Sequence, residues 1–408
     1  MTLTVVIFLA TYLAMAVGRL PGFRVDRTGA ALLGAIAMLV FGEITPDAAW
    51  AAVSFPTMAL LFGLMIVSGA FAVSGFYAWA AARAAALPVG PAGLLAVLVA
   101  VSGLLSAVLT NDVVVVAMVP LLVQLCLARS LNPTPFLLGF AFAANAGSSG
   151  TIIGSPQNMI IAQALDLSFV GFLRAAALPS LLSLVPVWAV LVLLYRNRWS
   201  LPAGETPDEP PPAVPLDLME TAKAAAVTVA VVAAFCLTGW PRDLVALGAG
   251  ALLLLNRRIA SADVMKHVDG NLFILLGGLF VVNAALAATG LPQHAIAEIR
   301  AWGLDLQHPL SLFLSMGVLS DIVGNNPAVL LILPYVQGGD PELIGAALAL
   351  GTGQASNIVV FGSLAGIIVV EEAGRRGAPI SLAEFSRAGV PVSILNMLLS
   401  AGWLLLLA

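Results

Sequence analysis

The stretch that decides the fold reads NAGSSGTIIGSPQN and covers residues 145–158. It interrupts an apolar segment, residues 134–165. Glycine, serine, asparagine and proline at this density oppose a continuous helix, because they favour turns or cannot donate to the helical hydrogen-bond ladder. The segment 134–165 is therefore predicted to be a helix that is unwound in its middle.

The composition predicts that this broken helix lies in a membrane. Of 408 residues, 61% are hydrophobic and 9% are charged, against about 25% charged residues in a soluble domain. A water-soluble fold is excluded. At roughly 20 residues per crossing, the apolar residues suffice for about ten transmembrane helices. The net charge of −4 gives no basic surface for nucleic acid, so no nucleic-acid partner is expected.

Positive charges predict the orientation of the chain, because loops rich in arginine and lysine stay in the cytoplasm. If residues 1–17 form a first helix that starts outside, Arg19, Arg24 and Arg27 follow it on the cytoplasmic side. On this topology 14 of the 17 basic residues are cytoplasmic, and both termini are extracytoplasmic. The run 200–217 contains six prolines and four acidic residues and is predicted to be a cytoplasmic linker.

Two segments are predicted to form helical hairpins. Residues 91–128 are long enough for two helices and are broken at Leu109-Thr110-Asn111-Asp112. Because Arg129 closes this segment on the predicted cytoplasmic side, a re-entrant hairpin fits it as well as two crossings do, and we adopt the hairpin. Residues 308–336 are its counterpart later in the chain, whereas residues 54–78 are expected to form one continuous helix.

The second half of the chain repeats the first. Similar residues recur 215, 214 and 208 positions later, in the pairs Ser74-Gly75 and Thr289-Gly290, Asn111 and Asn325, Pro120 and Pro334, and Gly154-Ser155 and Gly362-Ser363. Each half would have five crossings and one hairpin. Because five is odd, the second copy would be inverted in the membrane relative to the first. We therefore predict an all-α polytopic membrane protein with two inverted repeats, residues 1–199 and 218–408. It would have about ten transmembrane helices, two re-entrant hairpins and two broken helices, the second at 342–372.

Inverted repeats with breaks at matching positions are typical of secondary transporters, whose binding site lies at the membrane midplane. Unwound carbonyls there can bind a cation such as sodium, and helix N-termini can bind an anion. We expect substrate and ion binding at the breaks, by Thr110, Asn111, Asp112, Asn145, Gly147, Ser148, Ser149, Asn158, Asn325, Asn326, Thr352, Ser356 and Asn357. The candidate sodium ligands among them are Asn111, Asp112, Ser148, Asn325 and Ser356. No cofactor other than sodium is expected.

Asp112 is the most informative of these residues. A carboxylate deep in a membrane segment costs about 2.5–3.5 kcal/mol on insertion scales, so it indicates a function by default. It could bind sodium or carry a coupling proton, and the alternative is a helix N-cap at the hairpin tip. The same two alternatives, binding and capping, apply to Asn111 and Asn325. The small residues around the breaks could instead serve close helix packing.

An enzyme is not expected. The sequence has no His-Glu-x-x-His motif and no partner base for Gly147-Ser-Ser-Gly150, and its two cysteines, Cys126 and Cys236, lie in apolar runs. It also lacks a Gly-x-x-x-x-Gly-Lys loop for ATP. The energy for transport would then come from an ion gradient or a separate subunit.

Two strings resemble a known group of transporters. They are TNDVVVVAMVP at 110–120 and ANAGSSGTIIGSPQN at 144–158. They resemble the ion transporter superfamily of arsenite permeases, NhaD-type sodium/proton antiporters, citrate transporters and divalent anion:sodium symporters, and are most similar to its bacterial "anion transporter" permeases. In the dicarboxylate symporters of this group both tips read Ser-Asn-Thr. Here they read Thr110-Asn111-Asp112 and Asn325-Asn326-Pro327.

The resemblance implies an elevator-type movement of the hairpins and broken helices against a scaffold. It implies sodium sites that pair Asn111 with 147–149 and Asn325 with 355–357, substrate between the tips, a bacterial-type inner (cell) membrane and a homodimer. We therefore expect a sodium- or proton-coupled secondary transporter of a small anion. The alternative is a sodium/proton antiporter or an arsenite or oxyanion efflux permease that uses Asp112.

Overall fold

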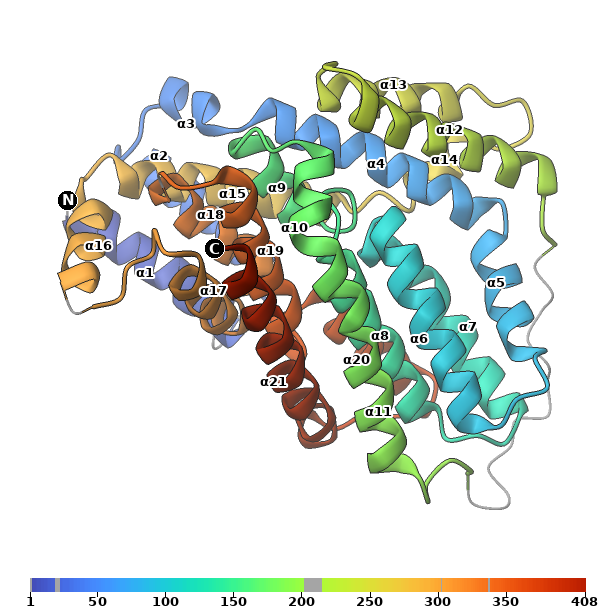
Figure 1. The fold of residues 1–408 in the computed structure, drawn as a ribbon. Helices are drawn as coiled ribbons and strands as arrows, with labels where there is room; N and C mark the ends of the chain where they lie inside the picture. Colours follow the sequence, from blue (N-terminus) through green and yellow to red (C-terminus); the bar gives the residue numbers. More distant parts are fainter. Residues whose placement is uncertain (1, 19–22, 202–214, 302, 337) are drawn as a thin grey trace.

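The computed structural model describes residues 2–18, 23–201, 215–301, 303–336 and 338–408 (Figure 1). In these ranges every regular element is a helix, and the only β-bridge joins Leu131 and Ser200. Seven of the described helices are long and apolar enough to cross a membrane. The predicted all-α polytopic class is confirmed. Most of the predicted linker 200–217 lies outside the described residues.

The helices follow one order twice. The first half contains α1 (Thr2–Val17), α2 (Arg27–Val40), α3 (Pro46–Ala52), α4 (Phe55–Val73), α5 (Phe76–Ala85), α6 (Pro91–Val108), α7 (Asn111–Ala128), α8 (Pro133–Ser148), α9 (Pro156–Ala164), α10 (Phe169–Leu182) and α11 (Leu184–Tyr195). The second contains α12 (Leu218–Leu237), α13 (Arg242–Leu254), α14 (Ser261–Met265), α15 (Gly270–Ala287), α16 (Leu291–Ala301), α17 (Pro309–Val323), α18 (Asn325–Ile332), the 3-10 turn η1 (Leu333–Tyr335), α19 (Pro341–Ala355), the 3-10 turn η2 (Val360–Gly362), α20 (Leu364–Arg375) and α21 (Leu382–Leu407). A short helix follows the second long one in each half, and a broken helix precedes the last segment in each half.

The predicted breaks are present. Helices α6 and α7 are separated by Leu109 and Thr110, and α17 and α18 by Gly324, whose φ of +96° is readily adopted only by glycine. The other two breaks separate α8 from α9 and α19 from α20. That each hairpin enters and leaves on one side of the membrane stays a prediction.

The expected continuous helix over 54–78 is wrong. Helix α4 ends at Val73, and Gly75 adopts a left-handed conformation with φ of +79° before α5 begins at Phe76. Glycine takes this conformation without the steric cost that a Cβ atom imposes. The hydrophobic pattern continues through the turn, which is why periodicity did not reveal it.

Two equivalent contacts relate the halves by a two-fold axis. A Cβ atom at Gly278 of α15 would lie 2.7 Å from the carbonyl oxygen of Ala31 in α2. A Cβ atom at Gly63 of α4 would likewise overlap the backbone of Ala246 in α13, and α13 lies along α4 in Figure 1. Both pairs of equivalent residues, Gly63 with Gly278 and Ala31 with Ala246, are 215 positions apart. The helix pairs α2–α15 and α4–α13 therefore form a symmetric, closely packed scaffold.

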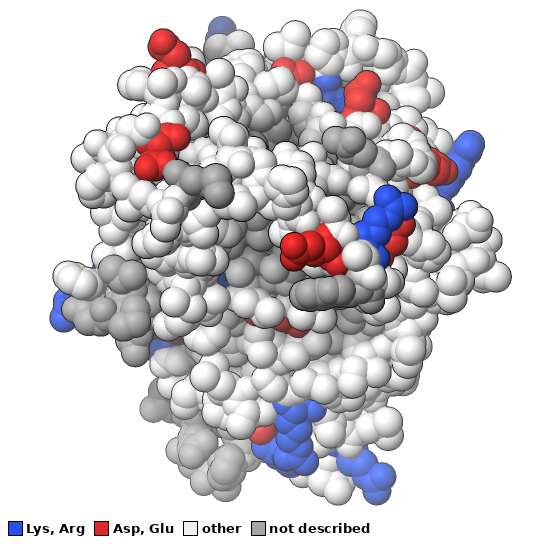
Figure 2. All heavy atoms as spheres, turned by 90° about the vertical axis from the view of Figure 1, so that its left-hand side faces the viewer, with Lys and Arg blue, Asp and Glu red and all other residues white. Residues whose placement is uncertain are grey.

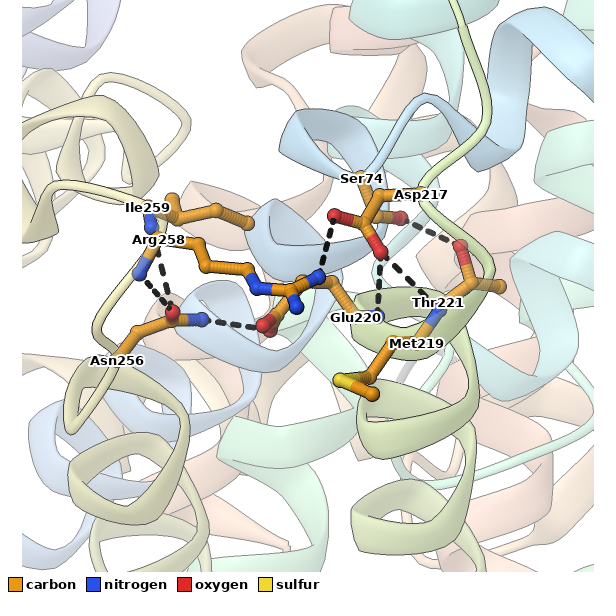
Figure 3. A network of polar contacts seen from close by, with 8 residues as sticks. All are labelled: Ser74, Asp217, Met219, Glu220, Thr221, Asn256, Arg258 and Ile259. Atoms are coloured by element: carbon orange, nitrogen blue, oxygen red, sulfur yellow. Dashed lines mark hydrogen bonds and ion pairs between the residues drawn. The ribbon is translucent and has the colours of Figure 1, made fainter.

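A polar network attaches the start of the second half to the first (Figure 3). The backbone N–H of Asp217 donates to the carbonyl of Ser74 at 2.9 Å, and the Asp217 side chain caps α12. Asn256, after α13, donates to the Glu220 carboxylate at 2.6 Å, and Arg258 lies 3.9 Å from Asp217. These contacts fix α12 and α13 beside the break between α4 and α5.

Charged side chains are sparse on the face in Figure 2, where most of the surface is uncharged. Many large apolar side chains are exposed along the outer helices, among them Leu9, Val185, Leu193 and Leu398. In water such a surface would aggregate, whereas hydrocarbon accommodates it. The exposed apolar surface and the buried polar residues described next are the arrangement expected of a membrane transporter.

Candidate functional site

Both hairpin tips open into one cavity of about 460 Å³, called the central cavity here. The first tip, Thr110–Asp112, contributes Asn111 and Asp112 to its lining. The second tip, Gly324–Pro327, contributes all four of its residues. The remaining lining comes mainly from the starts of α2 and α15 and from the segment around η2, at the start of α20. Two segments more than 200 residues apart thus meet at one site.

The first tip is attached to the first unwound segment. The backbone N–H of Asn111 donates to the carbonyl of Gly154 at 2.9 Å. Asn158 donates to the carbonyls of Ser148 at 2.9 Å and Thr151 at 2.8 Å. The side-chain oxygens of Asn111, Ser155 and Asn158 are buried without a hydrogen-bond partner. Unpartnered neutral oxygens on segments that meet at Gly154 are suitable ligands for a small, hard cation.

The second tip is attached to the second broken helix through side chains. The hydroxyl of Ser356 lies 3.0 Å from Oδ1 of Asn325 and 2.5 Å from the carbonyl of Thr352. Oδ1 of Asn326, which lines the cavity, is buried and has no partner. Asp321 lies behind this tip, where its Oδ1 would be 2.5 Å from a Cβ atom at Gly362. Both tips thus contact the broken helix of their own half, but they differ in chemistry, because only the first carries a carboxylate.

A hydrogen-bonded bridge connects the two unwound segments. Asn145 of the first donates to Oδ1 of Asn357 and to Oγ of Ser363 of the second, both at 2.9 Å. Gln354 donates to Oγ of Ser149 at 3.0 Å. Asn145, Ser149 and Asn357 therefore lie between the two breaks and are not among the residues that line the central cavity.

Three further residues singled out from the sequence support the helix ends. Gly147 lies against the backbone of Gly103 in α6, too closely for any side chain. The hydroxyl of Ser148 donates to the carbonyl of Asn145 at 3.2 Å, and that of Thr352 to the carbonyl of Leu348 at 2.9 Å. These three residues hold the broken helices in place beside the cavity.

Four carboxylates line the central cavity, and three of them have partners. Asp26 and Asp269 accept backbone N–H groups at the starts of α2 and α15, and Glu371 lies 3.7 Å from Arg375. Asp112 is 7% exposed and has no hydrogen-bond or ion-pair partner within the described ranges. No group of three His, Cys, Asp or Glu that could hold a metal occurs in the described chain. A cation here would therefore be bound by amides, hydroxyls, carbonyls and at most one free carboxylate.

Sequence reasoning missed Arg27 as a site residue. Its Nε donates to the carbonyl of Met15 at 2.9 Å and its Nη1 to that of Phe361 at 2.8 Å, and it lines the central cavity. In the sequence it reads only as one of the basic residues that set the topology. Ser68 was also missed: its hydroxyl accepts the backbone N–H of Thr110 at 3.0 Å and so holds the first tip against α4.

Known proteins resemble this chain along nearly its whole length. A family model described as citrate transporter matches residues 11–366. An uncharacterized transporter of Mycobacterium tuberculosis is 31% identical, with 98% of this chain and 97% of that protein covered. The silicon efflux transporter LSI3 of Oryza sativa subsp. japonica is 28% identical, with 87% of each chain covered.

A solved structure shares the fold. The YdaH transporter of Alcanivorax borkumensis, described as having an unusual topology, superposes with a TM-score of 0.53 over 99% of this chain and 97% of that chain. The two sequences are 15% identical, so this likeness concerns the fold alone.

Proposed function

The chain belongs to the citrate transporter family, and from that premise we propose that it is an ion-coupled secondary transporter of a small anion. It is a multi-pass membrane transporter, not an enzyme. The observation that carries the proposal is the convergence of both tips and the second unwound segment on one cavity of about 460 Å³. Such a cavity between repeat-related breaks is the arrangement from which alternating access arises.

Sodium ions are proposed to bind beside each tip. The first site would use the side-chain oxygens of Asn111 and Asn158, which have no other partner. The second would use Asn325 and Ser356, which already lie within hydrogen-bond distance of each other. Binding of a cation at each break would stabilise its tip and so prepare the cavity for an anion.

The described conformation is proposed to face the cytoplasm. The cavity is lined by the starts of α2 and α15 and by Glu371 near the end of α20, all of which lie on the cytoplasmic side of the predicted topology. The hairpins and broken helices would move as one body against the scaffold pairs α2–α15 and α4–α13. That movement would carry the cavity to the other side of the membrane.

A second candidate function is favoured by Asp112. This carboxylate lines the cavity and has no ion-pair partner among the described residues, so it could release a proton when it binds sodium. The chain would then be a sodium/proton antiporter or an oxyanion efflux permease. Efflux is the activity named for the rice relative. In this case transport would be coupled to protons through a single group.

Purified protein in liposomes tests the two functions together. Uptake and counterflow of citrate, phosphate, arsenite and silicic acid would be measured under a sodium gradient, a pH gradient or neither, with protein-free liposomes as control. Anion transport that follows one of the gradients is expected. If no solute moves under any gradient, the proposal is wrong, and sodium-driven proton movement without an anion would favour the antiporter.

A further inference from the structure

Arg27 places at the central cavity a guanidinium that has no ion-pair partner in the described part of the chain. It is the one lysine or arginine among the described residues that line the cavity, which also include the four carboxylates named above. Two backbone carbonyls hold its guanidinium, and its Nη2 is buried without a hydrogen-bond partner. Its Nη1 would be 3.2 Å from a Cβ atom at Gly324, so the guanidinium lies directly against the second tip. The described residues supply no carboxylate partner, since Asp26 instead caps α2.

Arg27 has a counterpart in the second half. It is the first residue of α2, and Arg242, which is 215 positions later, is the first residue of α13. Arg242 also donates to backbone carbonyls, those of Leu167 and Ala162, but it lies 3.4 Å from the Asp166 carboxylate and does not line the cavity. The two-fold axis therefore relates two arginines that have different partners in this conformation.

The two arginines contact the two broken helices at positions that are not equivalent. Arg27 reaches Phe361, in the unwound part of the second broken helix. The position equivalent to Phe361 in the first half, 208 residues earlier, is Ile153. Arg242 instead contacts Ala162, nine residues beyond it and near the far end of α9. Seven of these residues, 156–162, belong to α9 and correspond to about 10 Å of helix.

We propose that Arg27 and Arg242 bind the anionic group of the substrate in alternation, Arg27 in the described conformation and Arg242 in the opposite one. The inference rests on the proposed anion transport. When the hairpins and broken helices move by roughly the 10 Å that residues 156–162 span, Arg27 no longer contacts the second tip, and Arg242 contacts the first unwound segment near Ile153. Each arginine would then recognise the substrate from one side of the membrane.

Transport measured separately from the two sides tests this assignment. Right-side-out and inside-out vesicles would be assayed with citrate and phosphate for wild type, Arg27→Gln and Arg242→Gln. The control is Arg24→Gln, which changes an exposed arginine just before α2. Glutamine keeps N–H donors for the carbonyls but removes the charge. Loss of a charge-assisted hydrogen bond corresponds to roughly a ten- to hundredfold change in affinity for the anion.

We expect Arg27→Gln to raise the half-saturating anion concentration about ten- to hundredfold from the cytoplasmic side and much less from the outside. Arg242→Gln should do the reverse, Arg24→Gln should change neither, and Arg27→Lys should restore part of the affinity because it keeps the charge. Equal effects from both sides, or none, would overturn the inference. If wild type moves neither anion, the proposed function itself fails, which is a different result.

Cross-linking gives a second measurement that does not depend on transport rates. In a background without Cys126 and Cys236, Arg27→Cys with Phe361→Cys should cross-link in the described conformation. Arg242→Cys with Ile153→Cys should cross-link only after the movement, and increasingly so when the conditions favour the outward-facing state. A protein in which the second pair never forms, although the first forms and disappears, would contradict the exchange of arginines.

Discussion

Replacing Gly278 by alanine tests the symmetric scaffold more directly than any change at the tips. A Cβ atom there would lie 2.7 Å from the carbonyl oxygen and 2.8 Å from the carbonyl carbon of Ala31. Both are backbone atoms of α2 and cannot rotate away, so α2 and α15 must separate. The neighbouring Gly277 is the matched control, because its Cβ atom would meet only the end of the flexible Met58 side chain, at 4.0 Å.

The magnitude follows from two opposing effects. Overpacking of this kind costs about 1–3 kcal/mol, whereas replacing glycine by alanine within a helix contributes up to about 1 kcal/mol of stability. Gly278→Ala is therefore expected to lower the free energy of unfolding by up to about 2 kcal/mol, and to be about 1–3 kcal/mol less stable than Gly277→Ala. Gly277→Ala receives only the favourable contribution and should be neutral or slightly stabilising.

Thermal unfolding of the purified variants in one detergent measures the difference. Gly63→Ala, the two-fold equivalent, should resemble Gly278→Ala, because it forces the same separation between α4 and α13. The reasoning is refuted if Gly278→Ala is as stable as Gly277→Ala. A stable Gly63→Ala beside an unstable Gly278→Ala would show that the two contacts are not equivalent.

Three further predictions concern the breaks. Asp112→Asn should abolish the dependence of transport on the coupling gradient, while Asp263→Asn, which changes a half-exposed carboxylate paired with Lys266 outside the cavity, should not. Unchanged coupling in Asp112→Asn would exclude a coupling role for Asp112. Asn158→Ala removes hydrogen bonds to two carbonyls and should cost about 1–3 kcal/mol, measured by thermal unfolding; no loss would show that the unwound segment holds its shape without them. Ser356→Ala should raise the half-saturating sodium concentration severalfold, while Ser393→Ala, which changes a nearby buried serine, should not, and equal effects would argue against a sodium site at the second tip.

The breaks could be predicted from the sequence because their cause is local. Glycine, serine and proline at 145–158 oppose a helix whatever surrounds them, and glycine, serine and asparagine without the proline recur 208 residues later. The repeat then predicts that the two tips are equivalent, and the structure brings Asn111 and Asn325 to one cavity. Local composition and internal symmetry together were sufficient for this part of the site.

The contacts across the halves could not be predicted in the same way. Asn145 is bonded to Asn357, which is 212 residues later, and nothing in either local sequence indicates this pairing. The offset of the repeat relates equivalent residues, but these two are not equivalent. Their pairing depends on how the two broken helices pack against each other in three dimensions, which neither local composition nor the offset of the repeat specifies.

Arg27 is assigned two roles, and only its role in the membrane topology could be predicted from the sequence. A basic residue after the first helix is accounted for by the membrane topology, so its charge alone is no separate signal of a role at the site. Yet Arg27 and Arg242 are each the first residue of a helix, where a positive charge opposes the helix dipole at a cost of about 0.3–1 kcal/mol. An anchor could lie elsewhere in the loop without that cost. A cation that recurs after 215 residues at the same unfavourable position therefore indicates a role at the site.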